Sequence, residues 1–222
     1  MELPRRSSLP ASRLGVFPGT FNPPTRAHLE LAAAALEFVD EVLFVMPRRL
    51  PHKAYEGVGL AARMRLLEIC ISTEPRYSLG VTEGGLFADI ARECRSVYGP
   101  EVRLEFICGT DAAERFWNWD YGEAGAAADQ LKEFGLLVAS RGRSFHVPRN
   151  LAARVRRLNL TADWSAVSAT EVRERIRRGE PVPVSAYVAV TNRCRYNCWH
   201  CSKAHRPEGD LDFLRIPAVW MC

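Results

Sequence analysis

Thr25 and His28 stand three residues apart at the start of a predicted helix, directly after a loop that contains Gly19. The apolar run from Leu14 to Phe17 is typical of a buried strand, and the Pro-Gly pair that follows ends it. Thr25 is the expected N-cap, which places His28 on the opening turn. Glycine permits close approach of the backbone, and the free N–H groups of a helix start attract anions. The pattern therefore predicts a phosphate site in which Thr25 and His28 face the same anion.

The alternative is a capping threonine and an ordinary histidine, but the loop Gly19-Thr20-Phe21-Asn22-Pro23-Pro24 favours the phosphate site. The segment from Gly19 to Leu29 resembles the T/HxGH signature of the nucleotidyltransferase superfamily, and in detail that of the nicotinate or nicotinamide mononucleotide adenylyltransferases. Ala27 stands where many members have glycine. The resemblance implies that Thr25 and His28 are catalytic. It also implies that ATP binds at Gly19, Thr20, Phe21 and His28, and that Asn22 contacts the second substrate.

A second helix start lies about 140 residues further on, at Ser168-Ala169-Thr170-Glu171-Val172-Arg173. Ser168 followed by Glu171 is a capping box, which alone would explain the pattern. The stretch also resembles the superfamily's (I/V)S-x-T-x-x-R signature. That resemblance implies that Ser168 and Thr170 donate to ATP phosphate oxygens and that Arg173 makes a catalytic, charge-assisted contact to the β or γ phosphate.

The loop Pro47-Arg48-Arg49-Leu50-Pro51-His52-Lys53 follows a continuous apolar strand, Val42 to Met46. Ligands bind at the carboxyl ends of such strands in doubly wound sheets. A Pro-His-Lys at this place in the resembled family implies that Lys53 binds the substrate phosphate. Arg48 is a weaker candidate, because a solvated basic loop explains it equally well.

Asp111 follows the predicted strand Val102 to Cys108 and is placed to accept hydrogen bonds from a ribose. A plain helix N-cap is the alternative, and both roles are compatible. The resemblance implies that Trp119 stacks on a pyridine ring, a cation–π contact of about 1–2 kcal/mol when desolvated. Phe116 also falls on a family position, and Trp117 is interpreted as packing. The family's aromatic-threonine pair is absent, and Phe87 is the aromatic residue nearest to that place.

Apolar runs alternating with helical patterns predict a doubly wound, Rossmann-like parallel α/β sheet of five or six strands, of the nucleotidyltransferase type. The nucleotidyltransferase domain is expected to span residues 14–188, after a flexible leader at 1–13. Leu60 to Ser72 is predicted to be a helix, and Arg76 to Thr82 and Phe134 to Ser140 are predicted strands. Val155 to Leu160 is either a short sixth strand or a helix tail that continues into a strand.

The bulk properties narrow the function. With 222 residues and 47% hydrophobic composition, the chain can bury a full core. A net charge of +4 does not indicate a nucleic-acid partner, and no apolar run approaches the ~20 residues that span a membrane. Seven cysteines without a disulfide-like framework favour the cytoplasm. The oligomeric state is left open.

Residues 189–222 do not fit the resembled family. Cys194, Cys198 and Cys201 follow a short apolar run, and their C-x3-C-x2-C spacing resembles the opening of a radical S-adenosylmethionine domain. That resemblance implies a [4Fe–4S] cluster on three thiolates. A zinc site that uses His200, His205 or Cys222 is the alternative. Because only 21 residues follow Cys201, the fragment is expected to be truncated, and free thiols are the expected aerobic state.

The expected function is transfer of AMP from ATP to nicotinate or nicotinamide mononucleotide, with Mg²⁺ and release of pyrophosphate. One alternative is a nucleotidyltransferase for another phosphorylated acceptor, such as phosphopantetheine. The other is a metal-binding module with a degenerate nucleotide site, in which the cysteine tail is the working part.

Overall fold

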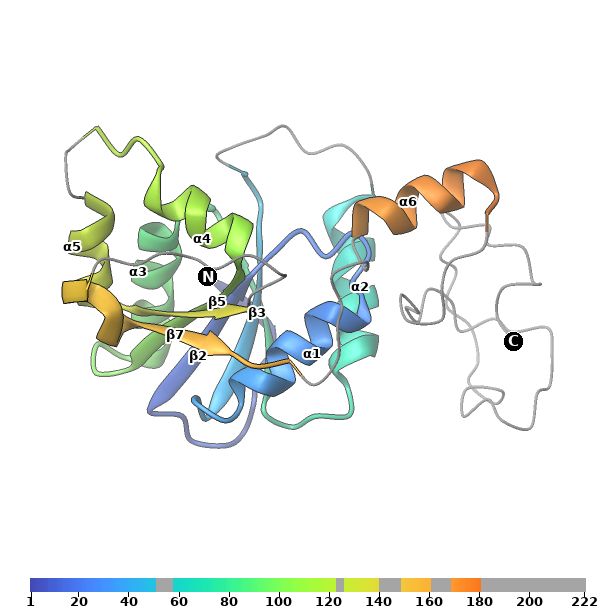
Figure 1. Cartoon of the computed structure of the whole chain (residues 1–222). Helices are drawn as coiled ribbons and strands as arrows, with labels where there is room; N and C mark the ends of the chain where they lie inside the picture. The colour runs from blue at the N-terminus through green and yellow to red at the C-terminus, as the bar shows by residue number, and fades with distance from the viewer. Residues whose placement is uncertain (51–57, 123–125, 140–148, 161–168, 181–222) are drawn as a thin grey trace.

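The computed structural model of the chain describes residues 1–50, 58–122, 126–139, 149–160 and 169–180 (Figure 1). These residues form one seven-stranded sheet with helices on both faces. The strands are β1 Glu2–Arg5, β2 Arg13–Pro18, β3 Glu41–Pro47, β4 Tyr77–Thr82, β5 Arg103–Gly109, β6 Gly135–Ala139 and β7 Val155–Leu158. The helices are α1 Arg26–Ala35, α2 Leu60–Ile71, α3 Phe87–Tyr98, α4 Thr110–Trp117, α5 Ala126–Glu133 and α6 Ala169–Arg178, with a 3₁₀ turn at Arg149–Arg154.

The strand order is β1-β4-β3-β2-β5-β6-β7, and the chain reverses its direction of travel across the sheet at β2. β2 pairs in parallel with β3 on one side, where Val16 lies opposite Leu43, and with β5 on the other, where Val16 lies opposite Phe106. Ligands bind outside the carboxyl ends of the strands at such a switch point. The fold therefore places the expected site among the loops that follow β2, β3 and β5.

Two apolar clusters hold the layers together. Alternate residues of β3 point to opposite faces, so that Phe44 joins the cluster under α1 and α2, whereas Leu43 joins the cluster under α3, α4 and α5. All seven residues of β3 are buried. Burial on both faces explains why the sequence of this strand is a continuous apolar run.

The predicted α/β fold is confirmed, with differences at the edges of the sheet. The sheet has seven strands instead of five or six, and its first strand runs antiparallel to β4. The prediction of a flexible leader at residues 1–13 is wrong. Arg5 Nε donates to the carbonyl of Tyr77 at 3.0 Å, and the Ser7 amide donates to Ser78 Oγ at 2.8 Å. Val155 to Leu158 is a strand, and the 3₁₀ turn at Arg149–Arg154 leads directly into it.

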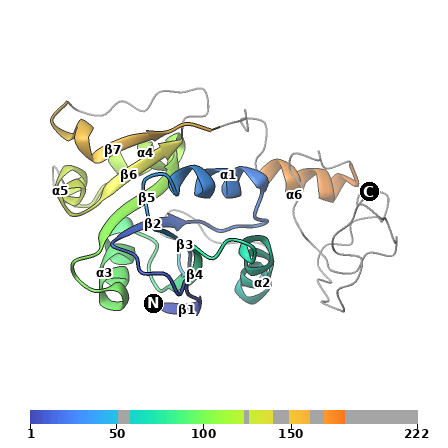
Figure 2. The same cartoon turned by 90° about the horizontal axis from the view of Figure 1, so that it is seen from below.

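α6 lies beside α1 and α2, away from α5 and the β7 edge, and both views agree on this placement (Figures 1 and 2). Arg173 of α6 donates from Nη1 to the carbonyl of Asn22 at 2.5 Å, across 151 positions of sequence. α6 is therefore joined directly to the loop that leads into α1. Within the described residues, no helix is long and apolar enough to cross a membrane.

Candidate functional site

His28 is held at the start of α1 by Thr25, which is the N-cap of the helix. The Thr25 amide donates to His28 Nδ1 at 3.0 Å, and Thr25 Oγ1 lies 2.8 Å from the same nitrogen. A backbone N–H can only donate, so Nδ1 accepts, and the neutral imidazole carries its proton on Nε2. Thr25 itself is 1% exposed. The structure therefore brings His28 to the surface of a pocket and places Thr25 behind it.

Aromatic rings fix the plane of this imidazole. The His28 ring centroid lies 5.3 Å from that of Phe21 and 6.0 Å from that of Phe17. Phe21 is buried and has φ +44°, a backbone conformation that side chains other than glycine rarely adopt. Phe21 thus packs against His28 from within the loop, and its ring is not offered to a ligand.

Backbone polar groups of the loop after β2 form hydrogen bonds within the protein. The Gly19 amide donates to the carbonyl of Val45 at 2.9 Å, so it extends the sheet. A Cβ at Gly19 would lie 2.8 Å from the Phe21 ring, which explains why glycine stands there. The carbonyl of Thr20 accepts from Arg63 Nη1 at 2.7 Å. Arg63 is 5% exposed and also donates from Nε to the carbonyl of Val58 at 3.0 Å.

The second signature meets the first at this loop. Arg173 donates to the carbonyl of Asn22 and, from Nη2, to Thr170 Oγ1 at 3.0 Å. Arg63 of α2 and Arg173 of α6 therefore hold neighbouring carbonyls of the same loop. Ser168 lies outside the described residues.

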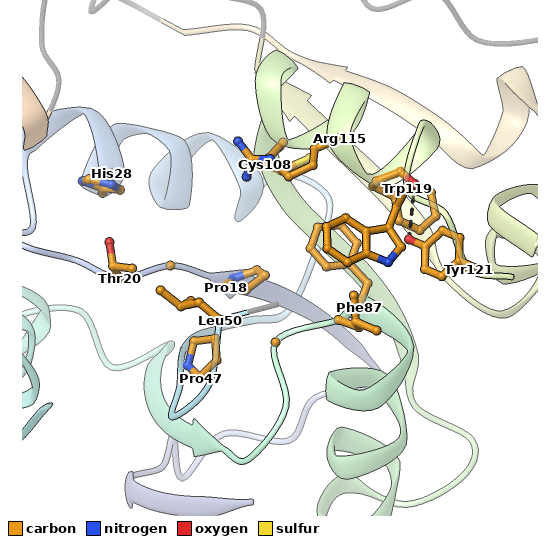
Figure 3. Close-up of a pocket in the computed structure, with 15 residues that line it drawn as sticks. Pro18, Thr20, His28, Pro47, Leu50, Phe87, Cys108, Arg115, Trp119 and Tyr121 are labelled. Carbon is orange, nitrogen blue, oxygen red and sulfur yellow. Dashed lines mark hydrogen bonds between the residues drawn. The ribbon is translucent and has the colours of Figure 1, made fainter. Parts of the chain in front are cut away.

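A pocket of about 290 Å³ opens at the carboxyl ends of β2, β3 and β5 (Figure 3). Its size is near the lower limit for small-molecule sites. The lining residues are Pro18, Gly19, Thr20, His28, Pro47, Leu50, Gly85, Leu86, Phe87, Cys108, Ala112, Arg115, Phe116, Trp119 and Tyr121. His28 stands at one end and Trp119 at the other (Figure 3). The pocket thus spans the switch point of the sheet.

The wall around Trp119 is aromatic. Phe87 stacks on Phe106 with ring centroids 4.4 Å apart and on Phe116 with centroids 5.3 Å apart. Tyr121 donates from its hydroxyl to the carbonyl of Phe116 at 3.2 Å, and burial raises the pKa of Tyr121 to about 12. The phenol therefore stays protonated at neutral pH. Trp117 packs partly buried against the core, in line with its interpretation as a packing residue.

The Cys108 thiol lies on the floor of the pocket and is buried. Burial raises the pKa of Cys108 to about 12. Since only the thiolate is a good nucleophile, this cysteine contributes shape to the pocket and no covalent chemistry at neutral pH.

Other predicted residues lie elsewhere. Asp111 is exposed in the first turn of α4 and does not line the pocket, and the N-cap of that helix is Gly109. Arg48 pairs with Glu2 at 2.7 Å and Glu83 at 3.0 Å, which ties the loop after β3 to the sheet edge. Lys53 lies outside the described residues.

Sequence reasoning missed Arg63 and Arg115. Ala112, Arg115, Phe116 and Trp119 follow the i, i+3, i+4, i+7 spacing of one helical face, and all four line the pocket. That spacing could have identified Arg115. No comparable signal marks Arg63, because its role depends on where α2 packs.

Among the described residues, no group of three or more histidine, cysteine, aspartate or glutamate side chains could hold a metal ion. Cys194, Cys198 and Cys201 lie outside this part of the chain. A cluster or zinc site on them stays a hypothesis from the sequence.

Residues 16–175 match the family described as cytidylyltransferase-like. The chain is 30% identical over 177 residues to a probable nicotinate-nucleotide adenylyltransferase of Thermus thermophilus, with 77% of this chain and 89% of the relative covered. A protein of the same name from a Thermoanaerobacter species is also 30% identical, over 188 residues, with 77% of this chain and 85% of the relative covered. A solved structure of Plasmodium falciparum nicotinic acid mononucleotide adenylyltransferase complexed with NaAD has a TM-score of 0.55 at 15% identity. It covers 74% of this chain and 84% of the other, and it supports the fold alone.

Proposed function

We propose that the chain, which belongs to the cytidylyltransferase-like family and within it to the nicotinate-nucleotide adenylyltransferases, transfers AMP from ATP to nicotinate mononucleotide and releases pyrophosphate. This reaction is a step of NAD biosynthesis. The single observation that carries the proposal is the pocket that runs from His28 to Trp119 across the switch point of the sheet. The His28 end suits the α phosphate of ATP, and the Trp119 end suits the aromatic ring of a pyridine mononucleotide.

The reaction needs alignment and charge neutralisation more than proton transfer. An oxygen of the mononucleotide phosphate forms a bond to the α phosphorus of ATP. The bond from that phosphorus to the bridging α,β oxygen breaks, and pyrophosphate leaves with the electron pair. Because the nucleophile is already an anion, no general base is required. Rate enhancement then depends on positioning and on stabilising the charge of the transferring group.

His28 is the residue assigned to the α phosphate. Its Nε2–H donor follows from the hydrogen bond that Nδ1 accepts from Thr25. Donation to a nonbridging oxygen would stabilise the charge that develops there. The role proposed for Thr25 is to fix the orientation of the imidazole. Its side chain is buried, so it acts on the phosphate through His28.

Arg173 and Thr170, with Ser168, are assigned to the triphosphate of ATP. Arg173 already touches the loop that carries Thr20 and Asn22, which supports a shared site for both signatures. Mg²⁺ prefers phosphate oxygens and water to an all-protein cage, so the ion is proposed to arrive on ATP. Its chemistry is to neutralise the departing pyrophosphate.

On the acceptor side, Trp119 is proposed to stack on the pyridine ring and Lys53 to hold the mononucleotide phosphate. Asp111 is proposed to accept hydrogen bonds from a ribose. Since Asp111 is exposed at the start of α4, this contact would lie at the outer edge of the site. The catalytic domain is proposed to span residues 14–188, extended by β1 at its edge. Residues 189–222 are proposed to be a cysteine-bearing segment outside the reaction.

The test is pyrophosphate release from ATP and Mg²⁺ with nicotinate mononucleotide and, in parallel, with nicotinamide mononucleotide. Turnover with the acid and much weaker turnover with the amide is the expected result. Equal turnover with both would leave the enzyme class intact and refute the preference. Absence of turnover with both, while phosphopantetheine is adenylylated, would refute the pyridine assignment.

A further inference from the structure

The pocket is electrostatically asymmetric. Among its described lining residues there is no carboxylate, and Arg115 is the only arginine or lysine. A pyridine mononucleotide brings a phosphate, and the nicotinate form adds a carboxylate. A cationic group in a pocket wall without acidic neighbours is complementary to such a ligand.

Arg115 has an ion-pair partner within reach in sequence and does not use it. Asp111 stands four residues earlier on the same helix, an arrangement that normally favours pairing. Within the described part of the chain, Arg115 makes no hydrogen bond and no ion pair. Its side chain extends from α4 toward the side of the pocket where His28 lies (Figure 3). The guanidinium is therefore directed to the pocket and not to its own helix.

The order of groups along the pocket identifies which anion Arg115 meets. Under the proposed function, the α phosphate lies at His28 and the pyridine ring at Trp119. The phosphate of the mononucleotide must lie between these two ends, because it attacks the α phosphate while it remains joined to the ring through the ribose. Arg115 projects away from Trp119 into this middle region (Figure 3).

We propose that Arg115 binds the phosphate of nicotinate mononucleotide and so positions the attacking group. This inference rests on the proposed function. Guanidinium and phosphate pair through two parallel N–H···O bonds, which fix the orientation of the phosphate as well as its distance. Lysine would keep the charge and lose that geometry.

The experiment compares Arg115→Gln and Arg115→Lys with the wild-type protein. Arg115→Gln should raise the KM for nicotinate mononucleotide about tenfold or more, because a hydrogen bond to a charged group is lost. Arg115→Lys should fall between the two proteins. The KM for ATP and the melting temperature should not change. The matched control is Arg103→Gln, which removes a positive charge from the first residue of β5, at the opposite end of that strand.

Nicotinate riboside separates the two anions of the substrate, since it keeps the carboxylate and lacks the phosphate. If Arg115 binds phosphate, Arg115→Gln leaves the inhibition constant of the riboside unchanged while the KM for the mononucleotide rises. A parallel rise in both would assign the guanidinium to the carboxylate and overturn the proposal. An unchanged KM for the mononucleotide would also overturn it. If the wild-type protein itself shows no turnover, the proposed function fails, and this inference fails with it.

Discussion

At the scale of single residues, His28 combines a fixed tautomer with a fixed ring plane. Thr25 determines which nitrogen carries the proton, and Phe17 and Phe21 limit rotation of the ring. A donor that is already oriented costs no reorganisation when charge develops on the α phosphate. The same Thr25–His28 contact is part of a capping box, so His28 caps α1 and lines the pocket at the same time.

His28→Ala should lower kcat by about 100-fold or more, as removal of one transition-state donor usually does. Steady-state pyrophosphate release measures the effect, and thermal unfolding checks that the fold is kept. His28→Asn retains a side-chain N–H donor and should lose less activity than His28→Ala. Near-normal turnover of His28→Ala would contradict the assignment.

Trp119 and Trp117 offer a matched pair for the acceptor end of the site. Trp119 lines the pocket, whereas Trp117 packs against the core. Trp119→Ala should raise the KM for nicotinate mononucleotide about tenfold, because stacking on an aromatic side chain contributes about 1–3 kcal/mol per base. Trp117→Ala should instead lower the melting temperature and leave that KM unchanged. Measuring KM and melting temperature for both variants tests the distinction, and the reverse pattern would exchange the two roles.

At the scale of elements, the loop between β2 and α1 is held from two sides. Arg63 of α2 binds the carbonyl of Thr20, and Arg173 of α6 binds the carbonyl of Asn22. Two helices that lie far apart in sequence thereby share one loop. Its shape depends on side chains outside the signature itself.

Arg63→Met should destabilise the protein by about 1–3 kcal/mol, because two partly buried carbonyls lose a charged donor. For a chain of this size, each kcal/mol lowers the melting temperature by about 2–4 °C. Turnover should also fall, since the displaced loop carries the start of α1. The matched control is Arg65→Met, which removes an exposed arginine from the same helix. Equal melting temperatures and equal kcat for the two variants would exclude a positioning role for Arg63.

The sequence predicted the central elements well, because their strands are buried on both faces. Val42 to Met46 is such a run, and β3 covers it with one further residue at each end. β1 escaped prediction because it has only four residues, which alternate between exposed and half-buried and include charged side chains at a sheet edge. The part of the pocket wall that α4 forms was not predicted, for a different reason. The helical spacing of Ala112, Arg115, Phe116 and Trp119 marks one face of α4, but that this face lines the pocket follows from where α4 crosses the end of β5.

At the scale of the whole molecule, the two ends of the pocket belong to different layers of the fold. His28 begins the helix on one face of the sheet, whereas Trp119 follows α4, which covers the other face. The two substrates can meet only where both layers reach the carboxyl edge of the sheet. This arrangement explains why the site lies at the switch point and why distant signatures are needed to build it.

The same arrangement makes a prediction about the cysteine tail. The pocket is lined by residues between Pro18 and Tyr121, and α6 contacts the loop that leads into α1. Replacement of Cys194, Cys198 and Cys201 by serine in the full-length chain should therefore leave kcat and both KM values within about twofold of wild type.

Iron and zinc content after anaerobic purification, measured together with turnover, completes this test. Metal bound by the wild-type chain and absent from the triple variant, with equal turnover in both, would show that the tail binds metal independently of adenylyl transfer. A triple variant that loses turnover together with its metal would contradict the proposed boundary of the catalytic domain, because the site would then depend on residues beyond 188. Introducing His28→Ala into the triple variant separates the contribution of the pocket to turnover from that of the cysteine tail. If turnover arises at the pocket alone, His28→Ala lowers kcat by the same factor with and without the three cysteines.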